Sequence, residues 1–139
     1  MIDLDTAKVM VTEARKKGRD LGLQPLAVVV IDDGGHIKAF EREDGASPGR
    51  FDIALGKAYG AVMLGMPGSA QMARAEAQAY FMTAANGVFG GKLVPVPGGV
   101  LVKRDGVIIG AVGVSGDVSD KDAEAAVAGI TAAGLDPVA

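Results

Sequence analysis

Two β-hairpin patterns constrain the fold of this chain more than any other feature of its sequence. In each pattern, two strand-like segments flank a turn that contains glycine: Leu26–Ile31, Asp32–Gly35 and His36–Arg42 in the first, and Val100–Lys103, Arg104–Gly106 and Val107–Val112 in the second. Glycine adopts the positive φ angles of a tight turn without steric cost, so each pattern predicts a pair of antiparallel strands. Hairpins, in place of strand–helix–strand crossovers, predict an antiparallel sheet covered by helices, which is an α+β fold.

Helical patterns surround and separate the two hairpins. Apolar residues recur at helical spacing in four segments, each with an expected cap: 4–21 (Asp3 or Asp5), 48–64 (Ser47, with Pro48 in the first turn), 70–83 (Ser69) and 120–133 (Ser119 with Asp122). Residues 86–99 are rich in Gly and Pro, and we expect them to be irregular apart from a short strand near Leu93–Val96. The predicted order is therefore α-ββ-αα-ββ-α.

The composition excludes several classes of protein. The 139 residues suit one domain, which we expect to span residues 1–139. A net charge of −3 and an aromatic content of 4% provide neither the basic surface nor the stacking platform of a nucleic-acid-binding protein. With no Cys and His36 as its only histidine, one chain cannot build a thiolate or multi-histidine metal site. No apolar run approaches the ~20 residues of a membrane span, and the acidic N-terminus lacks the layout of a signal peptide, so we expect a cytoplasmic protein.

The glycine-rich run Gly110–Gly116 has two interpretations. Gly110 and Gly113 fall in the second hairpin, where the absence of a side chain lets another backbone approach the sheet. Alternatively, backbone amides near the start of the last helix form a site for an anion or another ligand. A hydrolase motif is not expected, because Gly116 follows Ser115 directly and G-x-S-x-G requires one more residue between them.

A charged group near the end of the first hairpin is a candidate site. Lys57 lies among small and apolar residues of a predicted helix, so its ammonium group needs a partner. Asp44 or Glu41 can supply that partner, and Arg42 can clamp a carboxylate with two hydrogen bonds. The group is either an ion-pair cluster that fixes the loop to the helix or a cationic pocket for a carboxylate ligand. In the second case Arg42, Asp44 and Lys57 are candidate catalytic residues.

Segments in both halves of the chain carry a family pattern: Val30–Gly35, Phe40, Arg42, Asp44–Ala46, Ala54, Lys57-Ala58, Gly98-Gly99, Asp105–Gly116, Asp122 and Ala126. In these segments the chain resembles the GlcG/HbpS-like family, which includes the C-terminal domain of PduO-type proteins. The resemblance covers nearly the whole chain. It implies a profilin-like α+β fold with five antiparallel strands and flanking helices, and assembly into homo-oligomers from dimers to octamers.

The resemblance also implies a cofactor. Members of the family are described as haem-binding, and some as haem-degrading or iron-binding, so haem is the expected cofactor. The positions of this chain that match the family and are expected to bind the ligand are Arg42, Lys57, Gly98, Gly99, Ser115 and Gly116. PduO-type members place a histidine on the first helix, where this chain has Glu13-Ala14-Arg15. His36 is then the candidate haem ligand, provided that packing in an oligomer brings it to a cleft.

Two functions of different classes follow. The first is an oligomeric module that holds haem, or another flat carboxylate-bearing cofactor, with Arg42 or Lys57 near the carboxylates. The second is a small enzyme that acts on a carboxylate metabolite in a catabolic pathway, with Arg42 and Lys57 as anchors and Asp44 or Lys57 moving a proton. In both cases the partner is a small molecule, and neither a nucleic acid nor a membrane is expected.

Overall fold

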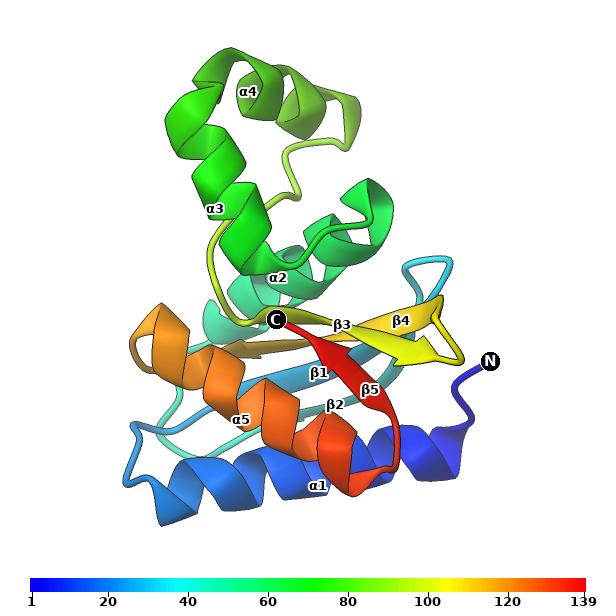
Figure 1. The fold of residues 1–139 in the computed structure, drawn as a ribbon. Coiled ribbons are helices and arrows are strands. Elements are labelled where there is room, and N and C mark those ends of the chain that lie inside the picture. Colours follow the sequence, from blue (N-terminus) through cyan, green and yellow to red (C-terminus); the bar gives the residue numbers. More distant parts are fainter.

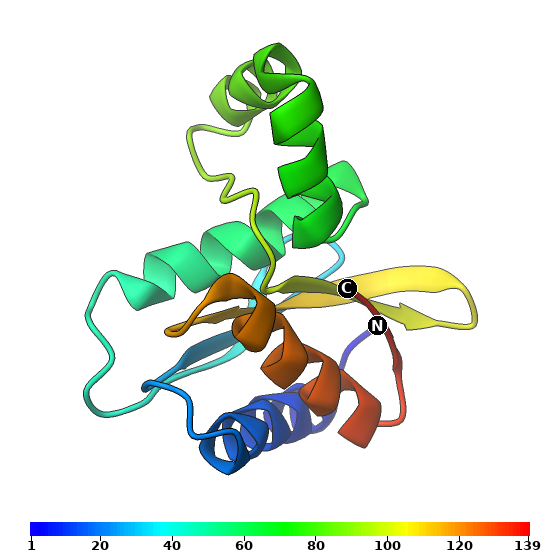
Figure 2. The same ribbon diagram turned by 60° about the vertical axis from the view of Figure 1, so that its left-hand side comes forward.

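An antiparallel sheet of five strands lies between two layers of helices (Figures 1 and 2). The computed structural model describes residues 1–139. Its strands are β1 (Ala27–Asp32), β2 (Ile37–Arg42), β3 (Gly99–Arg104), β4 (Val107–Ser115) and β5 (Asp136–Val138). Its helices are α1 (Leu4–Asp20), α2 (Arg50–Leu64), α3 (Gly68–Ala77), α4 (Ala79–Val88) and α5 (Ser119–Ala132). The strands follow the order β2-β1-β4-β3-β5 with every neighbouring pair antiparallel, which confirms the predicted α+β fold.

The two predicted hairpins form the centre of this sheet. β1 pairs with β2 and β3 pairs with β4, and the hairpins join where Ala27 of β1 lies opposite Ser115 of β4. β5 then adds to the outer edge of β3, where Leu101 lies opposite Val138. The fifth strand agrees with the family resemblance. Sequence periodicity did not indicate it, because three residues around Pro137 are too few to show an alternation.

Alternate residues of β1 point into two different cores. Val28 and Val30 join the larger buried cluster with α1 and α5, whereas Val29 and Ile31 join a smaller cluster with α2. Successive side chains of a strand point to opposite faces, so helices on both faces bury the first five positions of β1, Ala27–Ile31. This explains why the segment is apolar without interruption.

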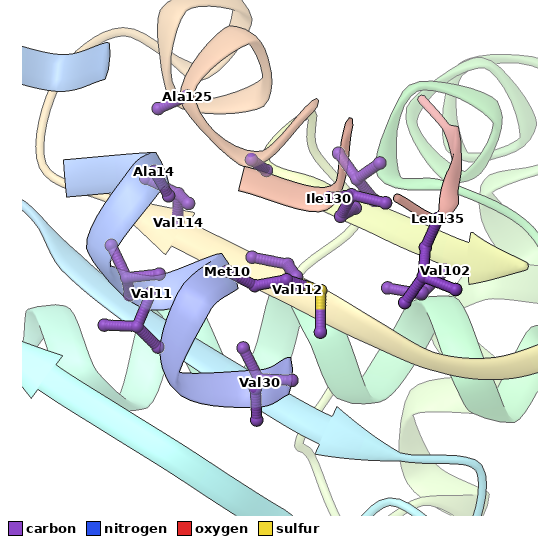
Figure 3. Close-up of a cluster of buried hydrophobic side chains, with 14 of the residues drawn as sticks. Met10, Val11, Ala14, Val30, Val102, Val112, Val114, Ala125, Ile130 and Leu135 are labelled. Atoms are coloured by element: carbon purple, nitrogen blue, oxygen red, sulfur yellow. The ribbon is translucent and has the colours of Figure 1, made fainter. Parts of the chain in front are cut away.

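Glycines let the helices pack closely against their neighbours. In the larger core, Met10 of α1 and Ile130 of α5 meet over the sheet (Figure 3). A Cβ atom on Gly129 of α5 would lie only 2.4 Å from the backbone oxygen of Met10. On the other face, a Cβ atom on Gly113 of β4 would lie 2.0 Å from the backbone oxygen of Ala54 in α2. The close-packing interpretation of Gly113 is therefore confirmed.

Between the hairpins the chain forms three helices, whereas two were predicted. The helix expected over residues 70–83 is divided because Gln78, at φ −141° and ψ 64°, departs from helical geometry between α3 and α4. Arg74 holds this bend, since its Nε donates to the Gln78 side chain and its guanidinium lies 4.2 Å from the centre of the Phe81 ring. None of the helices has the length and apolar character needed to cross a membrane.

The capping predictions hold for α1 and fail elsewhere. The Asp3 side chain accepts a hydrogen bond from the Thr6 backbone N–H at 2.7 Å, as expected for a cap. No side-chain cap is formed by Ser47, Ser69 or Ser119. Residues 47–50 form a turn in which the Arg50 N–H donates to the Ser47 carbonyl, and α2 begins only at Arg50. Proline is favoured at the second position of such a turn, so Pro48 marks a turn and not the first turn of the helix.

The segment between α4 and β3 is not the short strand that was expected near Leu93–Val96. It runs along α2, where the Val94 N–H donates to the Gly56 carbonyl at 3.4 Å. Pro95 and Pro97 have no N–H to offer to a neighbouring strand, which explains why the segment stays outside the sheet. Its position beside α2 makes it one wall of an apolar groove.

Candidate functional site

A buried ion pair joins the two helical layers around the end of the sheet. Lys57 of α2 and Asp122 of α5 meet with Nζ 3.1 Å from Oδ2. Lys57 Nζ also donates to the Val114 carbonyl at 3.0 Å, and Asp122 Oδ1 accepts from the Asp117 backbone N–H at 2.9 Å. The two residues are 2% and 0% exposed, so the pair is shielded from water.

Two consecutive glycines give the lysine side chain its path past the start of β3. A Cβ atom on Gly98 would lie 2.8 Å from Lys57 Nζ, and one on Gly99 would lie 2.2 Å from the Lys57 backbone oxygen. Gly98 also has a φ of +117°, which other residues rarely adopt. The close approach of Lys57 therefore explains why glycines occupy positions 98 and 99. Without side chains there, α2 and its lysine can contact the start of β3 directly.

Burial shifts the protonation equilibria of both partners toward their neutral forms. It lowers the pKa of Lys57, and Arg50 adds to this effect, while the attraction of Asp122 opposes it. Burial also raises the pKa of Asp122 against the opposing effects of Lys57 and of the Asp117 N–H. The pair therefore carries a desolvation cost that its hydrogen bonds offset.

Arg50 and Ser115 lie next to the ion pair. Arg50 Nη1 donates to the Ser115 hydroxyl oxygen at 3.1 Å, and this serine is fully buried. The Gly116 backbone N–H acts on the Asp122 carboxyl as well, where it opposes the rise in pKa that burial causes. The structure thus gathers five of the expected ligand-binding residues at one end of the sheet: Lys57, Gly98, Gly99, Ser115 and Gly116.

Arg42 and Asp44 do not belong to this group. Arg42 Nη1 donates to the Ala46 carbonyl within the loop that leads to α2, and Arg42 and Asp44 are both exposed. Lys57 is directed instead toward the opposite helical layer. The predicted catalytic set of Arg42, Asp44 and Lys57 is therefore not assembled in the structure.

The predicted ion-pair partners of Lys57 are also wrong. Glu41 pairs with Arg15 of α1 at 2.6 Å, and Asp44 is solvent-exposed in its loop. The partner is Asp122, which we expected to support the start of the last helix. Sequence proximity favoured Asp44 and Glu41, whereas the folded chain brings together residues 65 positions apart.

A groove of about 640 Å³ lies between α2, the β1–β2 turn and the segment after α4. Its apolar walls include Ile37, Ile53, Leu55 and Val94. Polar groups at its surface are His36, Asp52, Tyr59 and Lys92. Volumes of about 300–1,000 Å³ with apolar walls and a few polar groups are typical of small-molecule and cofactor sites.

His36 lies at this groove with its imidazole 81% exposed. Its Nδ1 is 3.4 Å from Asp32 Oδ1, which also accepts hydrogen bonds from the backbone N–H groups of Gly34 and His36. Partial burial tends to raise the pKa of Asp32. These backbone hydrogen bonds and the imidazole act in the opposite direction and together hold that pKa below its ordinary value. The cleft that we expected only from oligomer packing is thus present within one chain.

Sequence reasoning missed two other residues that line the groove with His36, Lys92 and Tyr59. Lys92 Nζ lies 5.3 Å from the centre of the Tyr59 ring, and that ring packs edge-on against Phe89 at 6.2 Å. Lys92 falls in a segment that looked irregular, and Tyr59 looked like one more apolar helix residue. The sequence held no local signal that would have joined them. No three side chains of the His, Asp or Glu type gather in a way that could hold a metal ion.

The chain is similar in sequence to known proteins. The family model described as "Haem degrading protein HbpS-like" matches residues 2–131. GlcG of Escherichia coli is 37% identical over 94 residues, which make up 65% of this chain and 63% of GlcG.

Solved structures share the fold along almost the whole chain. The crystal structure of a PduOC–haem complex aligns with a TM-score of 0.87 at 22% identity, covering 99% of both chains. A double mutant of HbpS from Streptomyces reticuli aligns with a TM-score of 0.80 at 27% identity, covering 94% of this chain and 85% of HbpS. With its fold and nearly all of its residues matched in this way, the chain belongs to the HbpS-like family.

Proposed function

We propose that the protein binds haem, or a similarly flat cofactor with carboxylate groups, in the groove between α2 and the β1–β2 turn. The observation that carries this proposal is an exposed imidazole, that of His36, at an apolar-walled groove of suitable volume. Membership of the HbpS-like family and the haem complex of PduOC support the choice of haem over other flat ligands.

The groups at the groove fit the parts of such a cofactor. Asp32 engages Nδ1 of His36, which leaves Nε2 as the nitrogen available to a metal centre. The apolar walls suit the flat ring, and the Lys92 ammonium suits a carboxylate. Asp52 would repel that carboxylate, so the charged edge of the ligand is expected near Lys92 and away from Asp52. Bound haem would supply an iron centre for ligand binding or redox chemistry.

The alternative function, an enzyme acting on a carboxylate metabolite, receives less support. Its proposed cluster of Arg42, Asp44 and Lys57 is not formed, and the Lys57 ammonium is buried against Asp122. A buried, paired lysine anchors helices more readily than it anchors a substrate. The geometry therefore favours binding over catalysis.

Titration of the purified protein with hemin tests the proposal. We expect a saturable, shifted Soret band for the wild-type chain. The His36→Ala variant should lose that shift because it removes the only imidazole, and Lys92→Gln should weaken binding by roughly tenfold. Lys16→Gln, an exposed position of α1 on the opposite face of the sheet, provides the control for a general loss of positive charge.

Two results would count against the proposal. Broad, non-saturating adsorption of hemin to the wild-type protein would exclude a specific haem site. A His36→Ala variant with unchanged spectrum and affinity would show that haem does not bind through His36 in this groove.

A further inference from the structure

Strand β2 forms an open edge of the sheet. It is the first strand in the order β2-β1-β4-β3-β5, so β1 is the strand that pairs with it. The other edge strand, β5, has three residues and contains Pro137, whereas β2 has six residues and no proline. An edge of this length without proline is a template for pairing with another extended chain. The edge of β2 is therefore the place where a further strand can join the sheet.

The pairing register shows which backbone groups of β2 are free. The N–H of Glu43, the residue after β2, donates at 2.9 Å to the carbonyl of the residue before β1. Hydrogen-bonded and non-hydrogen-bonded pairs alternate in an antiparallel ladder, so Glu41 and Ala39 also direct their backbone groups toward β1. Phe40 and Arg42 then direct theirs outward. Their N–H and C=O groups can pair with an added strand.

A groove of about 310 Å³ lies between this edge and helix α1, which packs beside β2 on one face of the sheet (Figure 1). Residues 38–41 of β2 form one side of the groove. The other side consists of residues on one face of α1, namely Leu4, Lys8, Val11 and Thr12. A groove between an edge strand and a helix suits an extended peptide, because backbone pairing holds the peptide while its alternate side chains contact the helix.

The charges at the groove select the kind of peptide. Lys8 and Lys38 line it, and no carboxylate lies within ion-pair distance of either ammonium group. Arg42 adds a third cation without a carboxylate partner, since its side chain hydrogen-bonds a loop carbonyl. The acidic residue that lines the groove, Glu41, is already paired with Arg15 at 2.6 Å. The open edge is therefore surrounded by unpaired positive charge, which is complementary to an acidic peptide.

We propose that the edge of β2 binds an acidic segment of a partner protein, which adds to the sheet as a further antiparallel strand. In this segment, acidic residues alternate with apolar ones. The acidic side chains lie on the α1 face of the sheet and reach Lys8 and Lys38. The apolar side chains lie on the opposite face beside Phe40, whose ring packs edge-on against Phe51 at 4.6 Å. Backbone pairing supplies affinity, and the two lysines supply selectivity.

Like charges disfavour pairing of this edge with the same edge of a second copy. In an antiparallel pair of β2 strands centred on Phe40, Lys38 of each copy would lie opposite Arg42 of the other. Like charges directly opposite each other destabilise a strand pair. Neither Phe40 nor Arg42 lines the groove assigned to haem, so this inference is independent of the proposed function.

Fluorescence anisotropy with a labelled peptide tests the proposal. The probe is a peptide of about seven residues that alternates valine and glutamate and is blocked at both ends. We expect saturable binding to the wild-type chain. The double variant Lys8→Gln/Lys38→Gln should bind about three- to tenfold more weakly. Lys121→Gln removes an exposed lysine of α5 and is the matched control, which should bind like the wild type.

Two further measurements separate backbone pairing from simple charge attraction. N-methylation of alternate residues of the peptide removes the N–H groups that face β2, so it should abolish binding although the charge is unchanged. The amide hydrogens of Phe40 and Arg42 should exchange fast in the free protein and at least about tenfold more slowly when the peptide is bound.

Several results would overturn the proposal. One is the absence of saturable binding to the wild-type chain. Another is equal binding of the N-methylated peptide, or of a peptide with lysine in place of glutamate. Slow exchange of the Phe40 and Arg42 amides in the free protein would also do so, because it would show that a second copy of the chain already occupies the edge.

Discussion

At the scale of single residues, Lys57 shows how a charged group can be buried when hydrogen-bond partners are provided for it. Its ammonium group has two partners, the Asp122 carboxylate and the Val114 carbonyl. Each hydrogen bond is charge-assisted, and together they offset part of the cost of removing the ion from water. The pair also links α2 to α5, so it fixes the distance between the two helical layers.

Removing one partner of this pair should be more harmful than removing both. Lys57→Met or Asp122→Leu leaves an uncompensated buried charge, so each should lower the free energy of unfolding by about 3–5 kcal/mol. The double variant should lose less stability than either single variant, and therefore far less than the sum of the two single changes. Urea unfolding of the four proteins measures this coupling. Strict additivity would mean that the two side chains act independently.

At the scale of elements, the approach of α2 to the sheet depends on the backbone at the start of β3. Gly99 lies against the Lys57 backbone oxygen, and Gly113 lies against that of Ala54, so α2 contacts two strands without intervening side chains. The middle of α2 is correspondingly rich in small residues, namely Ala54, Gly56, Ala58, Gly60 and Ala61. Close packing of this kind makes the position of Lys57 sensitive to a single methyl group.

Gly99→Ala should therefore destabilise the protein by about 2–3 kcal/mol, because neither the helix nor the strand backbone can move freely to relieve the overlap. Gly49→Ala is the control. A Cβ atom there meets nothing within 4 Å, and the backbone has an ordinary φ of −68°, so its effect should stay below about 1 kcal/mol. Thermal and urea unfolding compare the two variants. Equal stability of both would show that α2 adapts more easily than its packing indicates.

At the scale of the whole molecule, several surface carboxylates tie separate segments together and link folding to pH. Backbone N–H groups lower the pKa of Asp117, which joins Gln24 to the β4–α5 connection. The Thr6 N–H lowers the pKa of Asp3 at the start of α1. Partial burial tends to raise the pKa of Asp32, but its backbone hydrogen bonds in the β1–β2 turn outweigh this effect and lower the pKa.

These three shifts predict the acid sensitivity of the fold. A carboxylate with a lowered folded-state pKa stabilises the protein fully above its ordinary value of 3.8, and this stability is lost as the pH falls through the folded-state pKa. Asp122 contributes with the opposite sign, because burial raises its pKa. The net result should be a decline of the urea midpoint below about pH 4.

Replacing Asp3, Asp32 and Asp117 by asparagine keeps an acceptor oxygen at each position and removes its titration. The triple variant should be less stable than the wild type at pH 6 and should show a flatter profile from about pH 5 to pH 2. A single Asp33→Asn change in the exposed turn serves as the control. Parallel profiles of wild type and triple variant would place the acid sensitivity elsewhere.

Much of the fold was determined by local sequence. Both hairpins follow from glycine turns between β-branched runs, and α1 follows from apolar spacing with the Asp3 cap. Local sequence patterns did not predict the features that depend on contacts with other side chains or strands. The bend at Gln78 depends on Arg74 and Phe81, and β5 exists because β3 offers it an edge.

The candidate sites divide in the same way. The sequence by itself determined that Lys57 needs a partner, because a buried ammonium group is costly, and that His36 is the only imidazole. Only the tertiary structure decided that the partner is Asp122, that Arg42 and Asp44 lie elsewhere, and that Lys92 and Tyr59 line the same groove as His36. The physical reason is that turn and helix preferences act over a few residues. A binding site depends on which segments the sheet brings together, and that is set by the packing of the whole chain.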